Sequence, residues 1–202
     1  RCIGMPLESM DHRIVDEKGI DLPSGEAGEL LVRQKGGNPR RYFFSGYYKD
    51  ETATEESWKG GWWHTGDVVR EGPDGSLFFV DRRKNVIRRS GENIAAVEVE
   101  AVLLQHPDID GCAVCAVPDK IRGDEVFAFI ISNKEIEARA IFDHCMGYLT
   151  YYKVPGYIAL VPELPLTASQ KVSRGVIKQL ARKSLANADC EDLREFKKRI
   201  KR

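Results

Sequence analysis

The stretch FVDRRKNVIRRSGENI, residues 79–94, divides this 202-residue chain into two parts of different character. The residues before it read as short strands and turns, and those after it read as a small α/β module. The stretch contains five cations: Arg82, Arg83, Lys84, Arg88 and Arg89. A solvated charged face does not normally include apolar residues such as Val86 and Ile87 and then end on Ser-Gly. We therefore interpret this stretch as a hinge at the edge of a nucleotide site.

Hydrophobic periodicity predicts a β-rich region followed by an α+β module. Strands are expected at residues 11–16, 28–33, 68–70 and 77–80, with a short helix at 50–58 capped by Asp50. Beyond the hinge, helices are expected at residues 97–105, 134–149 and 172–185, and strands at 111–118, 125–132 and 157–161. This order predicts the α+β class: a small β-rich subdomain, residues 1–81, precedes a compact domain, residues 82–202, with a central three-stranded sheet and covering helices. The tail, residues 187–202, is expected to be a further charged helix or partly disordered.

The composition argues against several classes of function. Lys plus Arg and Asp plus Glu both number 31, so no global basic field favours nucleic acid. No apolar run approaches the roughly 20 residues of a transmembrane segment, and the first residues lack the apolar core of a signal peptide. Five cysteines without framework spacing fit a reducing compartment. We therefore expect a cytoplasmic protein.

Cys112 and Cys115 form a CxxC motif that could bind zinc or carry out redox chemistry. The motif lies within GCAVCAV, a buried-strand pattern in which residues three apart face opposite sides of a sheet. No second cysteine pair or histidine pair completes a metal site. We expect these residues to be core cysteines, and we expect no metal ligands in this chain.

Three sets of residues could carry nucleotide chemistry. Asp67 follows a glycine and precedes a strand, where a carboxylate could accept hydrogen bonds from two ribose hydroxyls or could cap a turn. Arg82, Arg83 and Lys84 could pair with phosphate or form a solvated charged turn, and Lys84 could absorb the backbone change of a hinge. Lys171 lies in a proline-anchored loop before a helix. It could be delivered to a phosphate or carboxylate, or it could be one of many surface lysines.

Several motifs, taken in order, resemble the C-terminal part of the acyl-adenylate-forming (AMP-binding) enzymes. This superfamily comprises acyl- and aryl-CoA synthetases, firefly luciferase and the adenylation domains of nonribosomal peptide synthetases. The motifs are GYYKDETAT, GGWWHTGDVV, GSLFFVDRRKNVIRRSGENIAAVEVE, HPDIDGCAVCAVPD with GDEVFAFII, and YKVPGYIALVPELPLTASQKVSR. The resemblance runs from about residue 3 to about residue 182. The run VDRRKNVIRRSGEN is most similar to CoA ligases of the carnitine/crotonobetaine and fatty-acid type.

The resemblance implies a role for each candidate in nucleotide chemistry. Asp67 would bind the ribose hydroxyls of ATP and of the acyl-AMP, and Arg82 would contact the ribose or the phosphates. Lys171 would reach the substrate carboxylate and the α-phosphate during adenylation. The family usually has glycine directly before this lysine. Here Gln170 occupies that position and reduces the freedom of the backbone.

The resemblance also implies a moving lid. Lys84 would be the hinge about which the small domain rotates between two half-reactions. Ser90, Gly91 and Glu92 would line the path of the CoA pantetheine when the thioester forms. The family often has Gly-Arg at the hinge, and this chain has Asp81-Arg82, a variant that is also common in CoA ligases.

The implied parent enzyme is an ATP-dependent carboxylic acid:CoA ligase, which makes acyl-CoA, AMP and pyrophosphate through an acyl-adenylate. The family's phosphate loop and acyl pocket lie in a large N-terminal domain, and nothing in this chain matches them. We therefore expect residues 1–81 to be the last β subdomain of that domain and residues 82–202 to be the lid. The chain alone should lack turnover, and the ligands of any Mg²⁺ should lie outside it.

Two other functions stay open on the sequence. The parent could be an adenylation domain that loads a phosphopantetheine carrier protein. The chain could also be a stand-alone, non-enzymatic binding module. A large apolar patch exposed before residue 82 would argue against the module, because it would mark the surface of a missing domain.

Overall fold

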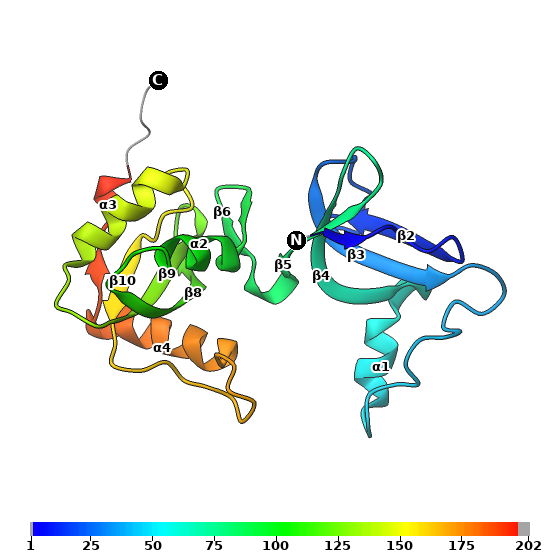
Figure 1. The fold of residues 1–202 in the computed structure, drawn as a ribbon. Coiled ribbons are helices and arrows are strands. Elements are labelled where there is room, and N and C mark those ends of the chain that lie inside the picture. The colour runs from blue at the N-terminus through cyan, green and yellow to red at the C-terminus, as the bar shows by residue number, and fades with distance from the viewer. Residues whose placement is uncertain (1, 198–202) are drawn as a thin grey trace. The chain divides into compact units, whose positions relative to one another are not determined.

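The computed structural model of the protein describes residues 2–197. The chain forms two compact units, Arg1–Lys84 and Asn85–Arg202 (Figure 1). The division after Lys84 falls inside the charged stretch of residues 79–94, three residues beyond the predicted boundary at residue 81. Within the described residues, no helix is long and apolar enough to cross a membrane.

Unit 1 is built on a five-stranded antiparallel sheet in the order β1-β5-β4-β3-β2. Its strands are β1 (Cys2–Gly4), β2 (Met10–Val15), β3 (Ala27–Gln34), β4 (Trp63–Glu71) and β5 (Leu77–Arg82). The strands expected at residues 11–16 and 28–33 are present as β2 and β3, which pair with each other, and those expected at 68–70 and 77–80 are present in the β4–β5 hairpin. β4 begins five residues before its predicted start at residue 68, because Trp63 and His64 pair with β3.

The core of unit 1 is small. Ile14, Leu30, Val69 and Leu77 form its buried cluster. Alternation along each strand places these side chains on one face of the sheet.

A second packing site in unit 1 surrounds α1 (Glu51–Ser57). The helix begins after Asp50, whose carboxylate accepts a hydrogen bond from Ala53 N at 2.9 Å, so the predicted cap is confirmed. The helix is followed by a short 3-10 turn, η1 (Lys59–Gly61). Trp58 is buried there and packs edge-on against Phe43 at 5.2 Å.

Unit 2 contains the three predicted strands as the long strands of its sheet. These are β8 (Ile109–Asp119), β9 (Gly123–Ser132) and β10 (Tyr157–Leu160). β8 is antiparallel to β9, and β10 is parallel to it. Three short strands, β6 (Ile87–Arg89), β7 (Glu92–Ile94) and β11 (Glu191–Asp192), bring the sheet to six strands. The α+β class is confirmed.

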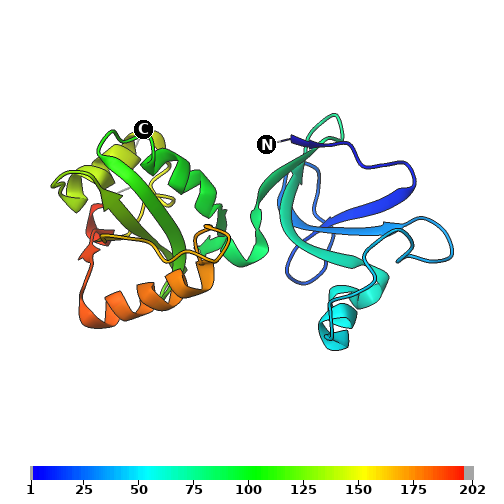
Figure 2. The same ribbon diagram turned by 60° about the horizontal axis from the view of Figure 1, so that its bottom comes forward.

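Helices cover both faces of this sheet. They are α2 (Ala96–Leu103), α3 (Ala138–Tyr148) and α4 (Arg174–Asn187). One core cluster packs the sheet against α2 and α3, and a second packs it against α4 (Figure 2). Cys112 contacts the first cluster and Cys115 belongs to the second, so the two cysteines of the CxxC motif lie on opposite faces as predicted. Both are free thiols, and burial raises the pKa of each to about 12.

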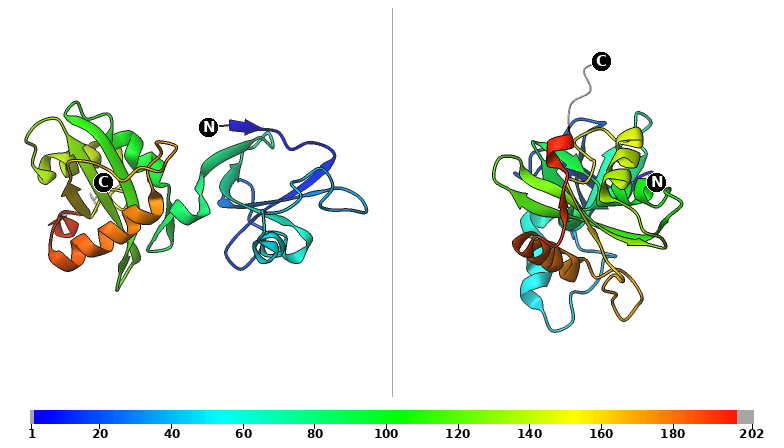
Figure 3. Two further views of the ribbon diagram at one scale, coloured as in Figure 1. Left: turned by 90° about the horizontal axis from the view of Figure 1, so that it is seen from below. Right: turned by 90° about the vertical axis from the view of Figure 1, so that its left-hand side faces the viewer.

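Two sequence predictions need correction in unit 2. α3 begins at Ala138 rather than at residue 134, because the Ser132 hydroxyl donates a hydrogen bond to Lys134 O at 2.7 Å and holds a turn there. The predicted helix in the tail is wrong for residues 188–197, which form β11 and a 3-10 turn, η3 (Arg194–Phe196), beside the sheet (Figure 3). Tertiary burial of Leu193 and Lys197 overrides the helical propensity of this charged segment. The rest of the predicted tail, residues 198–202, lies outside the described residues.

Candidate functional site

Asp67 and Arg82 lie opposite each other in the β4–β5 hairpin of unit 1. Arg82 Nε lies 3.0 Å from Asp67 Oδ1, and Arg82 Nη1 donates to Thr65 O at 3.1 Å. Asp67 Oδ1 is buried and has no aligned hydrogen-bond partner among the described residues, so its contact with Arg82 is an ion pair at close range. Asp67 therefore lies inside a strand, and its carboxylate keeps unused capacity to accept hydrogen bonds.

The local backbone explains how the Asp67 carboxylate is presented. Gly66 has φ of +70°, a conformation that glycine adopts without steric cost. A β-bulge follows between Val68 and Val69 in the pairing with β5. Bulges turn side chains out of the regular alternation of a strand and are common beside binding sites.

The residues just before the boundary between the two units contact β3 of unit 1. Arg83 lies in the 3-10 turn η2 (Arg83–Asn85), and its Nη1 donates to Glu29 Oε2 at 2.6 Å. His64 Nδ1 lies 3.2 Å from the same oxygen. Arg83 thus belongs to a carboxylate anchor, whereas Lys84 is exposed and is the last residue of unit 1.

Lys171 lies at the end of a tight turn that precedes α4. Thr167 N donates to Lys171 O at 2.7 Å, and Lys171 N donates to Thr167 Oγ1 at 3.2 Å. Leu166 and Val172 close the turn as a single antiparallel bridge. The backbone of Lys171 is therefore fixed while its side chain is exposed to solvent.

Gln170 has φ of +59°, in the left-handed region that favours glycine. Its backbone N donates to Thr167 O at 2.9 Å, which holds the turn closed in this conformation. Gln170 thus carries a side chain at a position where the backbone conformation favours glycine, the residue that the resemblance leads us to expect there. The turn that presents Lys171 is strained at the residue before it.

Ser90 and Gly91 form the two-residue turn of the β6–β7 hairpin. Their φ values are +53° and +87°, and positive φ at both central residues is the geometry of a type I′ turn. Turn geometry alone therefore accounts for Gly91. Ser90, Gly91 and Glu92 are all exposed, and Ser90 N donates to Arg122 O at 2.8 Å.

The family model for the AMP-binding enzyme C-terminal domain matches residues 98–171. Unit 2 carries an AMP-binding enzyme C-terminal domain. The chain is 37% identical over 182 residues to Triostin synthetase I of Streptomyces triostinicus, covering 88% of this chain and 33% of that protein. It is 34% identical over 179 residues to the crotonobetaine/carnitine–CoA ligase of Salmonella heidelberg, covering 87% and 34%. The chain thus spans about a third of the length of these curated relatives.

A solved structure matches both units of the chain. It is o-succinylbenzoate CoA synthetase from Bacillus subtilis, in complex with the acyl-adenylate intermediate OSB-AMP. The TM-score is 0.72 and the identity 34%, with 86% of this chain and 34% of that chain covered. These comparisons place the chain among homologues that are adenylate-forming enzymes.

Within unit 2, the two candidate segments lie apart. Figure 1 shows the β6–β7 hairpin and the loop before α4 at opposite ends of unit 2. The structure brings Asp67 and Arg82 together in unit 1, and Lys84 follows Arg82 by two residues. Among residues 2–197, no group of three or more His, Cys, Asp and Glu side chains is arranged to hold a metal ion.

Sequence reasoning did not identify the carboxylates that hold these segments. Glu29 anchors Arg83 from 54 residues away, and Glu125 pairs with Arg89 from 36 residues away. The one signal in the sequence for Glu125 is a charged residue at the start of the apolar strand EVFAFIIS. No pattern in the sequence pairs either carboxylate with its arginine.

Proposed function

We propose that the chain is the nucleotide-edge and lid portion of an ATP-dependent carboxylic acid:CoA ligase. The observation that carries the proposal is the Asp67–Arg82 pair, a carboxylate and a guanidinium held 3.0 Å apart on one hairpin directly before the boundary between the two units. The named activities of the relatives, CoA ligase and CoA synthetase, support the reaction class.

In the first half-reaction, a carboxylate oxygen of the acid attacks the α-phosphorus of ATP. The bond from that phosphorus to the bridging oxygen breaks, so that pyrophosphate leaves and an acyl-adenylate forms. Asp67 would accept hydrogen bonds from the ribose hydroxyls, and Arg82 would stay beside it. Lys171 would place its ammonium against the negative charge that develops on the phosphoryl oxygens, and such preorganised charge is a large term in catalysis.

In the second half-reaction, the CoA thiol loses its proton and its sulfur attacks the acyl carbon. The bond from the acyl carbon to the AMP oxygen breaks, giving the thioester and AMP. The exposed turn of Ser90, Gly91 and Glu92 would line the path of the pantetheine arm. Its small residues and open backbone suit a narrow path next to an extended chain.

The separation of the two segments supports a role for one in adenylation and for the other in thioester formation. The loop of Lys171 and the β6–β7 hairpin lie at opposite ends of unit 2 (Figure 1), so one rigid rotation of this unit could exchange them. Lys84 is exposed and ends unit 1, which suits a residue that absorbs the change in backbone angles.

The apolar surface of unit 1 favours a part of a larger enzyme over a stand-alone module. Ile3 in β1 and Met5 and Leu7 in the segment that follows it are 54%, 62% and 65% exposed. Three exposed apolar side chains within five residues suit a contact with further protein, which we take to be the large N-terminal domain.

The test measures the two half-reactions separately in the enzyme that contains this chain. Lys171→Ala should reduce acid-dependent ATP–pyrophosphate exchange by at least about 100-fold, typical of lost transition-state electrostatics. Thioester formation from supplied acyl-adenylate should stay within about threefold of wild type. Equal loss of both half-reactions would contradict the role of Lys171, and the absence of exchange with every acid tested would contradict the proposed function. The 202-residue chain alone should make no acyl-CoA.

A second acceptor needs its own measurement, because Triostin synthetase I is not named as a CoA ligase. The phosphopantetheine thiol of a carrier protein presents the same nucleophile as CoA. Transfer of the acyl group to free CoA is the expected result. Transfer to a carrier protein with no transfer to CoA would favour the adenylation-domain alternative.

A further inference from the structure

Glu125 is a fully buried carboxylate at the start of β9 that holds two separate segments of unit 2. Arg89 Nε, in β6, donates to both of its oxygens at 2.9 Å, and the Arg89 side chain is 3% exposed. Lys197, from the C-terminal segment, donates to Glu125 Oε1 and is fully buried. One carboxylate thus connects the β6–β7 hairpin to the end of the described chain.

The site around Glu125 is closely packed. A Cβ atom added at Gly156 would lie 2.7 Å from the Glu125 Cδ and Cγ atoms, so this glycine leaves the space that the carboxylate fills. Val126 N also donates to Oε1 at 2.9 Å. Arg122 Nη1 lies 3.6 Å from Oε2. The carboxylate therefore has fixed neighbours on each side, and its position is determined by packing as well as by charge.

The β6–β7 hairpin rests on the turn between β8 and β9. Arg89 pairs with Gly123, Ser90 N donates to Arg122 O at 2.8 Å, and Arg88 N donates to Asp124 Oδ2 at 3.0 Å. These hydrogen bonds join the main chain of the hairpin to partly exposed residues of the turn. The Arg89–Glu125 pair is the buried one, and breaking a buried pair on one side costs far more than breaking a surface pair.

The C-terminal segment holds the same turn from a second direction. Arg194 Nη1 donates to Asp119 Oδ2 at 3.1 Å, and Asp119 Oδ1 accepts hydrogen bonds from the backbone N of Ile121 and Arg122. Lys197 then reaches Glu125 itself. The order in space is therefore hairpin, turn and C-terminal segment, with Glu125 between the outer two.

We propose that Arg89 and Glu125 are positioning residues that fix the Ser90-Gly91-Glu92 turn for the attack of the thiol on the acyl-adenylate. This inference rests on the proposed function. Ser90, Gly91 and Glu92 are exposed and form only a two-residue turn, so their place depends on what anchors β6. Neither Arg89 nor Glu125 is expected to touch either substrate, because both side chains are buried.

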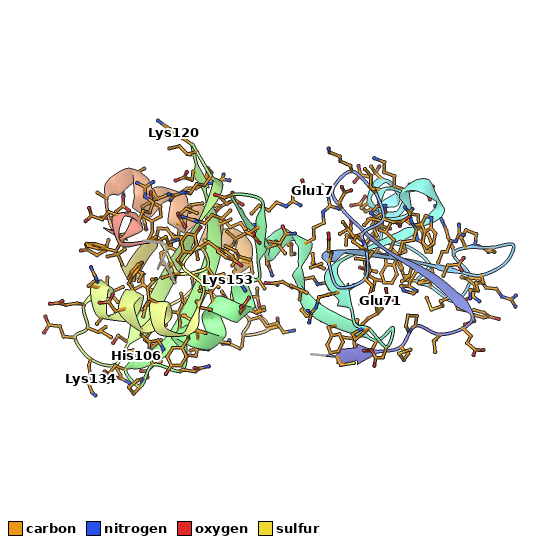
Figure 4. All side chains as sticks on the ribbon, turned by 90° about the horizontal axis from the view of Figure 1, so that it is seen from above. Glu17, Glu71, His106, Lys120, Lys134 and Lys153 are labelled. Carbon is orange, nitrogen blue, oxygen red and sulfur yellow. The ribbon has the colours of Figure 1, made fainter. Side chains whose placement is uncertain are left out.

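The charge balance around Glu125 offers a matched pair of variants. Arg89→Met removes the connection to the hairpin and leaves Glu125 paired with Lys197. Lys197→Met removes the connection to the C-terminal segment and leaves Glu125 paired with Arg89. Each variant replaces one buried cation with an apolar side chain, and the Glu125 carboxylate keeps the other buried cation as its partner. Because no buried charge is left unpaired, both variants should fold. Lys134→Ala is a distant control, since Lys134 lies at the opposite end of β9 from Lys120 and the β8–β9 turn (Figure 4).

The first measurement is amide hydrogen exchange in the 202-residue chain. Arg89→Met should reduce the protection of residues 87–94 by at least about tenfold. Lys197→Met and Lys134→Ala should leave protection there within about threefold of wild type. Unchanged protection in Arg89→Met, or equal loss in Arg89→Met and Lys197→Met, would overturn the proposal. This measurement needs no substrate, so it gives a result even if the proposed function fails.

The second measurement is the pair of half-reactions in the enzyme that contains the chain. Arg89→Met should slow thioester formation from supplied acyl-adenylate by at least about tenfold while ATP–pyrophosphate exchange stays within about twofold. Arg89→Lys, which keeps the cation, should recover part of the thioester rate. Equal slowing of both half-reactions would show a structural role only and would overturn the assignment to the thiol step. If wild type itself lacks exchange with every acid, the proposed function fails and the hydrogen-exchange result alone decides how the hairpin is held.

Discussion

Arg82 Nε lies 3.0 Å from Asp67 Oδ1, and the two residues face each other across the β4–β5 hairpin. The pair is half-exposed, with 54% of the Arg82 side chain and 30% of the Asp67 side chain accessible. An ion pair of this kind contributes at most about 1 kcal/mol to the stability of a fold. The pair is therefore expected to matter little for folding, so that the ribose contact proposed for Asp67 can be tested apart from stability.

Asp67→Asn should separate these two effects. The free energy of unfolding should change by less than about 1 kcal/mol, as expected for a half-exposed pair. Adenylation in the enzyme that contains the chain should fall about 10- to 100-fold, because hydrogen bonds to a charged acceptor are worth about 1.5–3 kcal/mol. Urea unfolding and ATP–pyrophosphate exchange measure the two quantities. Glu55→Gln, which breaks the exposed Arg40–Glu55 pair, is the control and should leave exchange unchanged. A large loss of stability with unchanged exchange would contradict the prediction.

Gln170→Gly should be more stable than Gln170→Ala by about 1 kcal/mol. A side chain at positive φ costs roughly 1–2 kcal/mol, and glycine recovers part of this after its larger unfolded-state entropy is subtracted. The comparison with alanine removes the effect of the glutamine side chain itself. Chemical unfolding of the two variants measures the difference. Equal stability, or a more stable alanine variant, would show that the turn of residues 167–171 is not strained at φ of +59°.

Cys115 and Cys145 are buried and Cys112 is partly buried, so these three thiols should resist thiol reagents while the exposed Cys2 reacts. Burial raises the pKa of Cys112, Cys115 and Cys145 to about 12, so roughly 1 in 10⁴ of each is thiolate at pH 8. Cys2 is exposed and should react first. Timed alkylation followed by peptide mass spectrometry gives the order. Fast labelling of Cys112 or Cys115 in the folded protein would contradict their placement on the two buried faces of the sheet.

The same three thiols make stability fall with alkaline pH. Their folded pKa lies above the unfolded value near 9, so the folded state holds its protons more tightly. This contribution is complete below pH 9 and is lost as the pH rises through 12. A rise in the free energy of unfolding with pH near pH 9 would therefore come from a group other than these thiols.

Lys197 should make the free energy of unfolding rise with pH. Desolvation by burial lowers the pKa of Lys197 to about 8 and outweighs the opposing effect of Glu125, which raises it, so the unfolded state binds its proton more tightly than the folded state. Its contribution to stability should therefore rise as the pH increases from 8 to 10.5, by an amount on the order of 3 kcal/mol at about 1.36 kcal/mol per pKa unit. The difference in unfolding free energy between wild type and Lys197→Met, measured at pH 7.5, 9 and 10, isolates this contribution because the cysteines cancel. A constant difference over this range would show that the amine is not buried.

Local patterns predicted the elements of this protein well. Alternation in EVFAFIIS and in the strand that contains Cys112 and Cys115 predicted the central strands, since side chains of a strand point alternately to its two faces. Asp50 predicted the start of α1, because its carboxylate satisfies the first free N–H groups of the helix. The helix offered as one alternative for the tail is wrong for residues 188–197, because burial of Leu193 and Lys197 in contacts with distant residues outweighs local propensity.

The sequence by itself determined the order of the elements, the α+β class and the family, and it singled out the charged stretch of residues 79–94. Only the tertiary structure decided what each charge in that stretch contacts: Arg82 pairs with Asp67, Arg83 with Glu29 and Arg89 with Glu125. The physical reason is the separation of the interacting residues along the sequence. Periodicity and caps act between residues a few positions apart, whereas these ion pairs join residues 15 to 54 positions apart that come together only when the sheets form.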